Sequence, residues 1–117
     1  MLLFALGDNA SSIGVYRFTD NTGRTYVGST TDQDFATRLG QHINSGKLPA
    51  ENVGTVQTIN MNDASPQEIY NTEASEIARS GERSTQGGTT SNVRRPPNSG
   101  GIADDPIERG KKSRFGC

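Results

Sequence analysis

The feature that most constrains the fold is a turn signal between two short β-like runs near the start of the chain. Residues 13–19 and 24–29 are rich in β-branched and aromatic residues, and Asp-Asn-Thr-Gly at 20–23 separates them. Asn and Asp tolerate positive φ and Gly adopts it without steric cost, so this tetrapeptide favours a tight antiparallel turn. The sequence therefore predicts a β-hairpin over residues 13–29.

Each strand of this hairpin carries one tyrosine and one glycine. Gly14 and Tyr16 stand in the first strand, and Tyr26 and Gly28 stand in the second. Glycine weakens a strand and often marks a place where another backbone or a substrate comes close. The pairing of tyrosine with glycine in both strands therefore indicates more than an ordinary hairpin.

The pairing register decides whether the two tyrosines can act together. A three-residue loop closed by Thr19 and Gly23 places Tyr16 directly opposite Tyr26 on one face of the sheet. A two-residue loop closed by Asp20 and Gly23 sends the tyrosines to opposite faces. The sequence alone leaves both registers open.

An amphipathic helix is expected after the hairpin, over about residues 32–45. Thr-Asp-Gln-Asp at 31–34 carries an N-cap signature, with the Thr hydroxyl as the cap and acids in the first turn. Apolar residues then recur every four positions, at Phe35, Leu39 and Ile43. Gly46 stands where a helix end favours positive φ.

A third strand and a second helix complete the predicted core. Residues 53–61 are β-branched and of mixed polarity, which is typical of a strand. Ser65 followed by Pro and then by Glu68 is a capping-box start, and the helix is expected to run to about Ser80 and stop at Gly81.

Three polar residues on these helices stand in unusual places. Arg38 and His42 lie one turn apart, beside the apolar stripe of the first helix. Glu73 falls between Ile69 and Ile77 on the apolar face of the second helix. A carboxylate within a buried stripe is costly unless it is paired or binds a cation, so Glu73 indicates a site.

The composition fits one small domain. The 117 residues are 30% hydrophobic with no Trp, and the single cysteine is Cys117. This composition excludes an intramolecular disulfide, and no Cys/His spacing indicates zinc. The apolar run at residues 1–6 is too short for a secretion signal, and nothing approaches the ~20 apolar residues of a membrane span.

We expect three segments: a lead-in at 1–12, a folded core at 13–81 and a Gly/Ser/Arg-rich, loop-rich extension at 82–117. The lead-in contributes apolar residues that we expect either to pack on the core or to form an extra strand, namely Leu2, Leu3, Phe4 and Leu6. Residues 1–78 hold four Lys/Arg and nine Asp/Glu, whereas 79–117 hold eight and four. The basic extension offers candidate phosphate contacts, unless these charges are simply solvated: Arg94, Arg95, Lys111 and Lys112.

These features together resemble the GIY-YIG nuclease family. Gly-Val-Tyr at 14–16, Tyr-Val-Gly at 26–28, Arg38, His42 and Glu73 occur in the family's order, on the expected kinds of element, over about residues 13–78. The resemblance implies an α+β fold with a small three-stranded antiparallel sheet flanked by helices, and it favours the register that places Tyr16 directly opposite Tyr26. It also implies hydrolysis of a nucleic-acid phosphodiester with one divalent metal, Mg²⁺ or Mn²⁺.

Carried over residue by residue, the resemblance implies a role for each side chain. Glu73 would be the metal ligand, a hard oxygen donor suited to Mg²⁺. Tyr16 would act as general base or orient the attacking water, and Tyr26 would hydrogen-bond the water or a phosphate oxygen. Arg38 would stabilise charge on the scissile phosphate, and His42 would assist proton transfer or phosphate positioning.

Other interpretations of these residues remain open at this point. The family often supplies a further Asn, for which Asn92 is the nearest match, although its spacing from Glu73 is long. Glu73 could instead pair with Arg79, and Glu76 would replace it as ligand if the helix were rotated. Both tripeptides carry Val where the family has Ile, which keeps a β-branched side chain.

The resulting functional hypothesis is a metal-dependent DNA endonuclease. A minimal catalytic core with a Gly/Ser/Asn-rich extension is similar to the toxin domains of bacterial competition systems. Such a toxin would act in the cytoplasm after delivery into target bacteria by a secretion system, and a cognate immunity protein would be its partner. The alternatives are a non-catalytic nucleic-acid-binding module of the same fold, a ribonuclease, or a fragment of a phage or homing-type nuclease.

Overall fold

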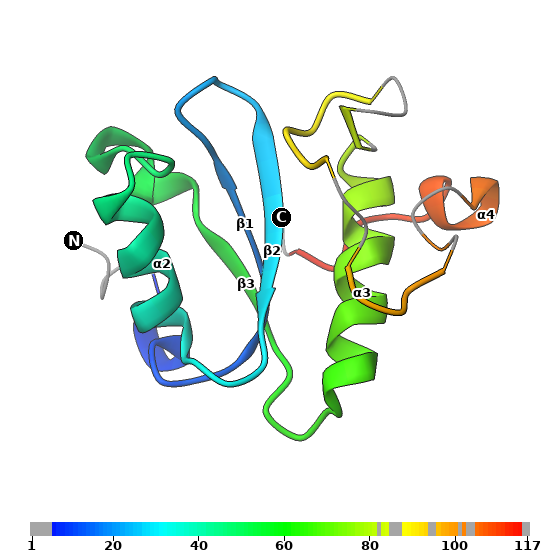
Figure 1. Ribbon diagram of the computed structural model, residues 1–117, viewed down its shortest axis with the longest axis horizontal. Helices are drawn as coiled ribbons and strands as arrows, with labels where there is room; N and C mark the ends of the chain where they lie inside the picture. Colours follow the sequence, from blue (N-terminus) through cyan, green and yellow to red (C-terminus); the bar gives the residue numbers. More distant parts are fainter. Residues whose placement is uncertain are drawn as a thin grey trace.

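A three-stranded antiparallel sheet with one helix on each face forms the centre of the molecule (Figure 1). The computed structural model describes residues 6–81, 83–84, 88–93, 96–100, 102 and 105–115. Its main elements are β1 (Gly14–Thr19), β2 (Thr25–Thr30), α2 (Phe35–Asn44), β3 (Gln57–Asn60) and α3 (Pro66–Arg79). The described residues also form the short helices η1 (Gly7–Asn9), η2 (Ala50–Thr55) and α4 (Pro106–Arg109). The expected α+β fold is confirmed.

Alternation along β1 divides the interior into two cores, because successive strand side chains point to opposite faces. Tyr16 and Phe18 pack with the α2 side, in a cluster that also includes Leu6, Phe35, Leu39, Leu48, Val53 and Val56. Val15 packs with the α3 side, in a cluster with Val27, Ile69, Ile77 and Phe115. Of the two alternatives for the lead-in, Leu6 follows the first and packs on the core, whereas residues 2–4 lie outside the described residues.

The hairpin adopts a register that the sequence did not single out. Tyr16 pairs with Gly28 and Tyr26 with Phe18, so the tyrosines share a face but stand diagonally rather than directly opposite each other. The closing pair is Asp20 and Arg24, joined by Asp20 N–H donating to the Arg24 carbonyl at 2.8 Å. The predicted closure at residue 23 was wrong because Gly23, with φ +81°, is needed inside the loop as its left-handed residue.

The two glycines of the paired motifs are explained by close approach. Gly14 has φ +148°, and a Cβ there would overlap the Ile59 carbonyl oxygen of the neighbouring β3. A Cβ on Gly28 would overlap the ring and hydroxyl of Tyr16. The first glycine therefore allows β1 and β3 to pair, and the second lets the Tyr16 ring lie across β2.

Helix α2 begins later than predicted. Asp34 caps it, with a carboxylate oxygen accepting from Thr37 N at 2.8 Å, and the first turn contains no acid. Thr31 is not the cap because the preceding segment is held to the N-terminal region, where Phe35 N–H donates to the Ser12 carbonyl at 2.9 Å. The helix ends as expected, since Gly46 has φ +84°.

The third strand is shorter than predicted, because residues 53–55 belong to η2. Asn52 in η2 donates from Nδ2 to the carbonyls of Thr19 at 3.0 Å and Asp20 at 3.1 Å. These bonds hold the helical turn against the end of the hairpin, so that only Gln57–Asn60 pair with β1. Helix α3 follows with the predicted capping box between Ser65 and Glu68.

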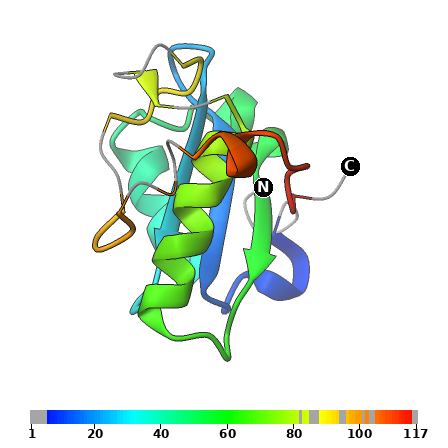
Figure 2. The same cartoon turned by 90° about the vertical axis from the view of Figure 1, so that its right-hand side faces the viewer.

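The C-terminal segment leaves α4, passes α3 and reaches the sheet (Figures 1 and 2). Phe115 is 4% exposed in the α3-side core, and the Arg17 guanidinium carbon lies 4.5 Å from its ring centroid. The extension therefore contributes to the core, although the predicted boundaries at 12 and 81 stay a prediction. None of the described helices has the length and apolar composition needed to cross a bilayer.

The glycines give a paired test of this packing. We expect Gly14→Ala to lower the free energy of unfolding by about 2–4 kcal/mol, because it combines backbone strain with an overlap against Ile59. Gly40→Ala is the control, since Gly40 lies inside α2 with no atom within 4 Å of its added Cβ. It should raise stability by about 0.5–1 kcal/mol in urea unfolding. A Gly14→Ala protein as stable as wild type would contradict the packing described.

Candidate active site

The predicted site residues of the hairpin and of α2 meet in one aromatic cluster. The Tyr16 hydroxyl lies 2.6 Å from His42 Nε2, and this contact is buried. The His42 ring centroid lies 5.6 Å from that of Tyr16 and 5.5 Å from that of Tyr26. The two tyrosine centroids are 6.5 Å apart. The shared sheet face that the site requires is therefore present.

Burial keeps both partners of the Tyr16–His42 bond neutral. Burial raises the pKa of Tyr16 well above its ordinary value; the charge of Tyr26 adds to this and that of Arg38 opposes it. Burial, with Arg38 and Lys47 as smaller causes, lowers the pKa of His42 to about 4. We therefore assign the phenol as donor and Nε2 as acceptor, which places the ring proton on Nδ1.

Arg38 supplies positive charge to this pair. It stands one turn before His42 on α2, is half-buried, and donates from Nη1 to Gln41 Oε1 at 2.8 Å. The charge of Arg38 lowers the pKa of the Tyr16 phenol, against the larger effect of burial. The structure thus brings together four of the predicted residues: Tyr16, Tyr26, Arg38 and His42.

Glu73 approaches the cluster from α3, on the other side of the sheet. Burial raises the pKa of Glu73 to about 7, and a hydrogen bond with Ser29 only partly opposes this. The charge of Glu73 in turn raises the pKa of both Tyr16 and Tyr26, so the three groups are within electrostatic reach of one another. Because β2 is an edge strand, Glu73 can meet the tyrosines around the open side of the sheet.

The surroundings of Glu73 fit a divalent cation. Within the part of the chain that the structure describes, no Lys, Arg or His pairs with this carboxylate. The same residues hold no group of three or more His, Cys, Asp or Glu side chains that could enclose a metal. One half-buried carboxylate without a cation partner among the described residues suits Mg²⁺, which keeps several waters and takes further oxygens from substrate phosphates.

A pocket of about 370 Å³ opens beside Glu73. Its wall combines Tyr26 and Glu73 with residues from loop segments: Lys47, Ser91, Asn92, Val93, Pro96 and Pro97. Val93 is 57% exposed, so the pocket opens to the surface. Lys47 was not singled out from the sequence. Its only signal was its place after Gly46, where the chain leaves α2.

Asn92 anchors the extension to the edge of the sheet. Its Oδ1 accepts from Val27 N at 3.0 Å, and its Nδ2 donates to the Val27 carbonyl at 2.7 Å. Next to it, Ser91 N donates to the Thr25 carbonyl at 2.8 Å. The side chain thus covers the free backbone groups of β2 and positions the loop segment that lines the pocket.

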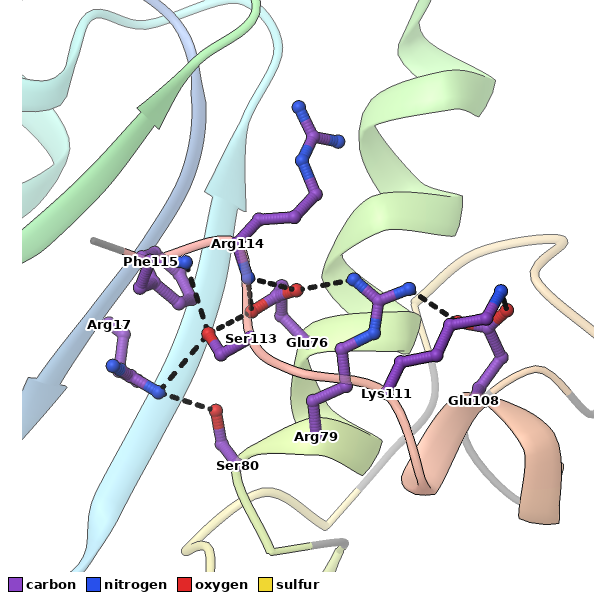
Figure 3. Close-up of polar contacts among 9 residues, drawn as sticks. All are labelled: Arg17, Glu76, Arg79, Ser80, Glu108, Lys111, Ser113, Arg114 and Phe115. Carbon is purple, nitrogen blue, oxygen red and sulfur yellow. Dashed lines mark hydrogen bonds and ion pairs between the residues drawn. The ribbon is translucent and has the colours of Figure 1, made fainter. Parts of the chain in front are cut away.

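Glu76 serves a network apart from the pocket (Figure 3). Its fully buried carboxylate accepts from Arg79 Nη1 at 2.9 Å, from Ser113 Oγ at 2.5 Å and from Arg114 N at 3.1 Å. The alternative of Glu76 as metal ligand is therefore wrong in this structure. The alternative of a Glu73–Arg79 pair is wrong as well, because Arg79 pairs with Glu76 and with Glu108.

Two of the basic residues predicted to contact nucleic acid, Lys111 and Lys112, do not line the pocket. Lys111 pairs with Glu108 at 2.9 Å, next to α4 on the side of α3 that faces away from the sheet (Figures 1 and 3). Lys112 is exposed in the same segment. Arg94 and Arg95 lie outside the described residues. Their contribution to substrate binding stays a prediction.

The single histidine of the chain makes the site directly observable. We expect the ring proton signals of His42 to titrate with a pKa of about 4 in wild type. Arg38→Gln should raise this pKa, because it removes a repulsive cation, whereas Lys112→Gln should leave it unchanged. Because the pKa of His42 in the folded protein lies below the ordinary 6.5, the unfolded chain binds this proton more readily. Protonation of His42 therefore lowers the free energy of unfolding as the pH falls from about 6.5 toward 4. A proton NMR titration giving an ordinary pKa would refute the buried arrangement.

Comparison with known proteins agrees with the geometry. The model of the GIY-YIG catalytic domain matches residues 12–73, which is more than half of the chain. No curated protein and no solved structure gives a significant match. The matched region spans both tripeptides and reaches Glu73. The chain therefore belongs to the GIY-YIG nuclease family, and its substrate is a nucleic acid.

Proposed function

We propose that this nuclease is a metal-dependent endonuclease that hydrolyses DNA phosphodiesters in the centre built by Tyr16, Tyr26, Arg38, His42 and Glu73. One observation carries the proposal. Glu73 is a half-buried carboxylate with no cation partner among the described residues, and it lies within electrostatic reach of a buried phenol that is hydrogen-bonded to a neutral imidazole. Burial disfavours the charged forms of the Glu73 carboxyl, the Tyr16 phenol and the His42 imidazole. A divalent metal with a bound phosphate would supply the opposite charges that these groups lack.

Glu73 is the residue that would hold the metal, Mg²⁺ or Mn²⁺. When bound, such a cation supplies positive charge to the phosphate and lowers the pKa of nearby water. It would also restore the ionised state of Glu73, whose pKa is raised to about 7 by burial.

The remaining chemistry belongs to the side chains. The Tyr16 oxygen accepts a proton from the attacking water while its own proton passes to His42 Nε2, along the 2.6 Å hydrogen bond. The water oxygen then bonds to phosphorus as the bond to the leaving oxygen breaks; the leaving oxygen takes a proton from solvent, and His42 returns its proton to solvent. The low pKa of His42 keeps Nε2 free to accept at neutral pH. Arg38 stabilises the charge that develops on the phosphate, and Tyr26 orients a phosphate oxygen or the water.

We also propose that the nuclease is a toxin of bacterial competition, covered by an immunity protein until it reaches the cytoplasm of a target cell. The proposal rests on the similarity of a minimal catalytic core with a Gly/Ser/Asn-rich extension to such toxin domains. The pocket adds a surface that a partner could block, because its rim includes the exposed residues Val93 and Pro97.

Plasmid cleavage tests the enzymatic proposal. We expect wild type to nick plasmid DNA with Mg²⁺ and to stop when the metal is chelated. Glu73→Gln should lose on the order of 10³-fold in rate, and Tyr16→Phe about 10²–10⁴-fold. Glu51→Gln is the matched control, because Glu51 is exposed on η2 and outside the pocket. Cleavage that persists in Glu73→Gln would refute the metal site, and faster cleavage of RNA would replace DNA as the substrate.

Expression in bacteria tests the toxin proposal. Wild type made in the cytoplasm should stop growth, and Tyr16→Phe should remove this effect. The product of the neighbouring reading frame should restore growth and co-purify with the domain. Normal growth with active wild-type enzyme, or no retained partner, would reject the toxin role while leaving the nuclease assignment intact.

A further inference from the structure

We propose that Lys47 is a phosphate-binding residue of this centre, and that its ammonium group contacts a non-bridging oxygen of the scissile phosphodiester. The inference deepens the proposed function and rests on it. Neither the sequence motifs nor the family match, which covers residues 12–73 as a whole, assigns a role to this lysine.

The backbone of Lys47 is held from two sides. Its carbonyl accepts from Asn21 N at 2.9 Å, which ties it to the hairpin turn. The next residue, Leu48, is fully buried and donates its N–H to the His42 carbonyl at 3.1 Å. Gly46, with φ +84°, makes the sharp change of direction that points the chain back toward the hairpin. The position of Lys47 is therefore fixed by the end of α2.

The side chain of Lys47 lies in the pocket that holds Glu73. Its Nζ is 4.1 Å from the ring centroid of Tyr26, which is a cation–π contact. No acidic residue pairs with this ammonium among the described parts of the chain. The aromatic ring satisfies one side of the ammonium, so its remaining N–H donors stay available to an anion in the pocket.

The charge of Lys47 reaches the catalytic pair. It contributes, after burial and Arg38, to the low pKa of His42. Each tyrosine of the centre thus has its own cation: the charge of Arg38 acts on Tyr16, and the ammonium of Lys47 lies over the ring of Tyr26. Phosphodiester hydrolysis adds negative charge to the phosphate oxygens in the transition state, and two cations at separate points can stabilise it. An ammonium is a common phosphate ligand.

A phosphate titration followed on the single histidine tests the assignment without requiring cleavage. In metal-free wild type, inorganic phosphate should shift the His42 ring signals in a saturable way. Lys47→Gln should weaken the apparent affinity at least about 10-fold, and Lys47→Arg should recover part of it. Arg24→Gln is the control, because it removes an equal charge from an exposed position in the hairpin turn. Thermal unfolding confirms that each variant is folded.

The outcomes separate this inference from the proposed function. No response of wild type to phosphate, or an equal response in Lys47→Gln, overturns the assignment. In plasmid cleavage with Mg²⁺, Lys47→Gln should lower kcat/KM about 10²-fold and Arg24→Gln less than about 3-fold. Equal losses in both variants also overturn the assignment. If wild type binds phosphate through Lys47 but cleaves no nucleic acid, the proposed function fails and the phosphate site stands.

Discussion

The structure depends on one close approach, between the phenol of Tyr16 and the backbone of Gly28 in the neighbouring strand. The two residues are directly paired, and a side chain on Gly28 would overlap the Tyr16 ring. Because β2 is an edge strand without a Cβ at this point, the phenol lies across the sheet and its hydroxyl reaches His42 at 2.6 Å. The same register puts Tyr26 on this face. The paired tyrosine–glycine motifs are therefore needed for the packing of the hairpin, apart from any role in catalysis.

Burial shifts the pKa values of the titratable groups in this centre and makes their charged forms unfavourable. Burial raises the pKa of Glu73 to about 7, above the ordinary 4.5, so its contribution to stability is fully present below pH 4.5 and is lost as pH rises through 7. His42 has the opposite dependence, because its lowered pKa of about 4 costs stability as pH falls below 6.5. The metal-free protein thus holds a carboxyl and an imidazole that both resist charging. A cation and a phosphate are the partners that would relieve this cost.

Local signals in the sequence predicted most of the fold, and long-range contacts decided the rest. Turn chemistry and apolar periodicity gave the hairpin, both helices and the place of Glu73 on a buried stripe. The predicted strand register was wrong because both expected loops used Gly23 as a closing residue, whereas its positive φ places it within the loop. The predicted helix start was wrong because Asp34, and not Thr31, is the N-cap. Lys47 could not be predicted, since its contact with Tyr26 joins a helix end to a strand and carries no periodic signal.

The central claim is that Glu73 holds a metal beside the Tyr16–His42 pair, and paramagnetic Mn²⁺ tests it most directly. The chain has one histidine, so its ring signals report on this place alone. Substoichiometric Mn²⁺ should broaden the His42 signals in wild type, excess Mg²⁺ should reverse the broadening, and Glu73→Gln should abolish it. Broadening of equal strength in Glu73→Gln, or none in wild type, would contradict the account.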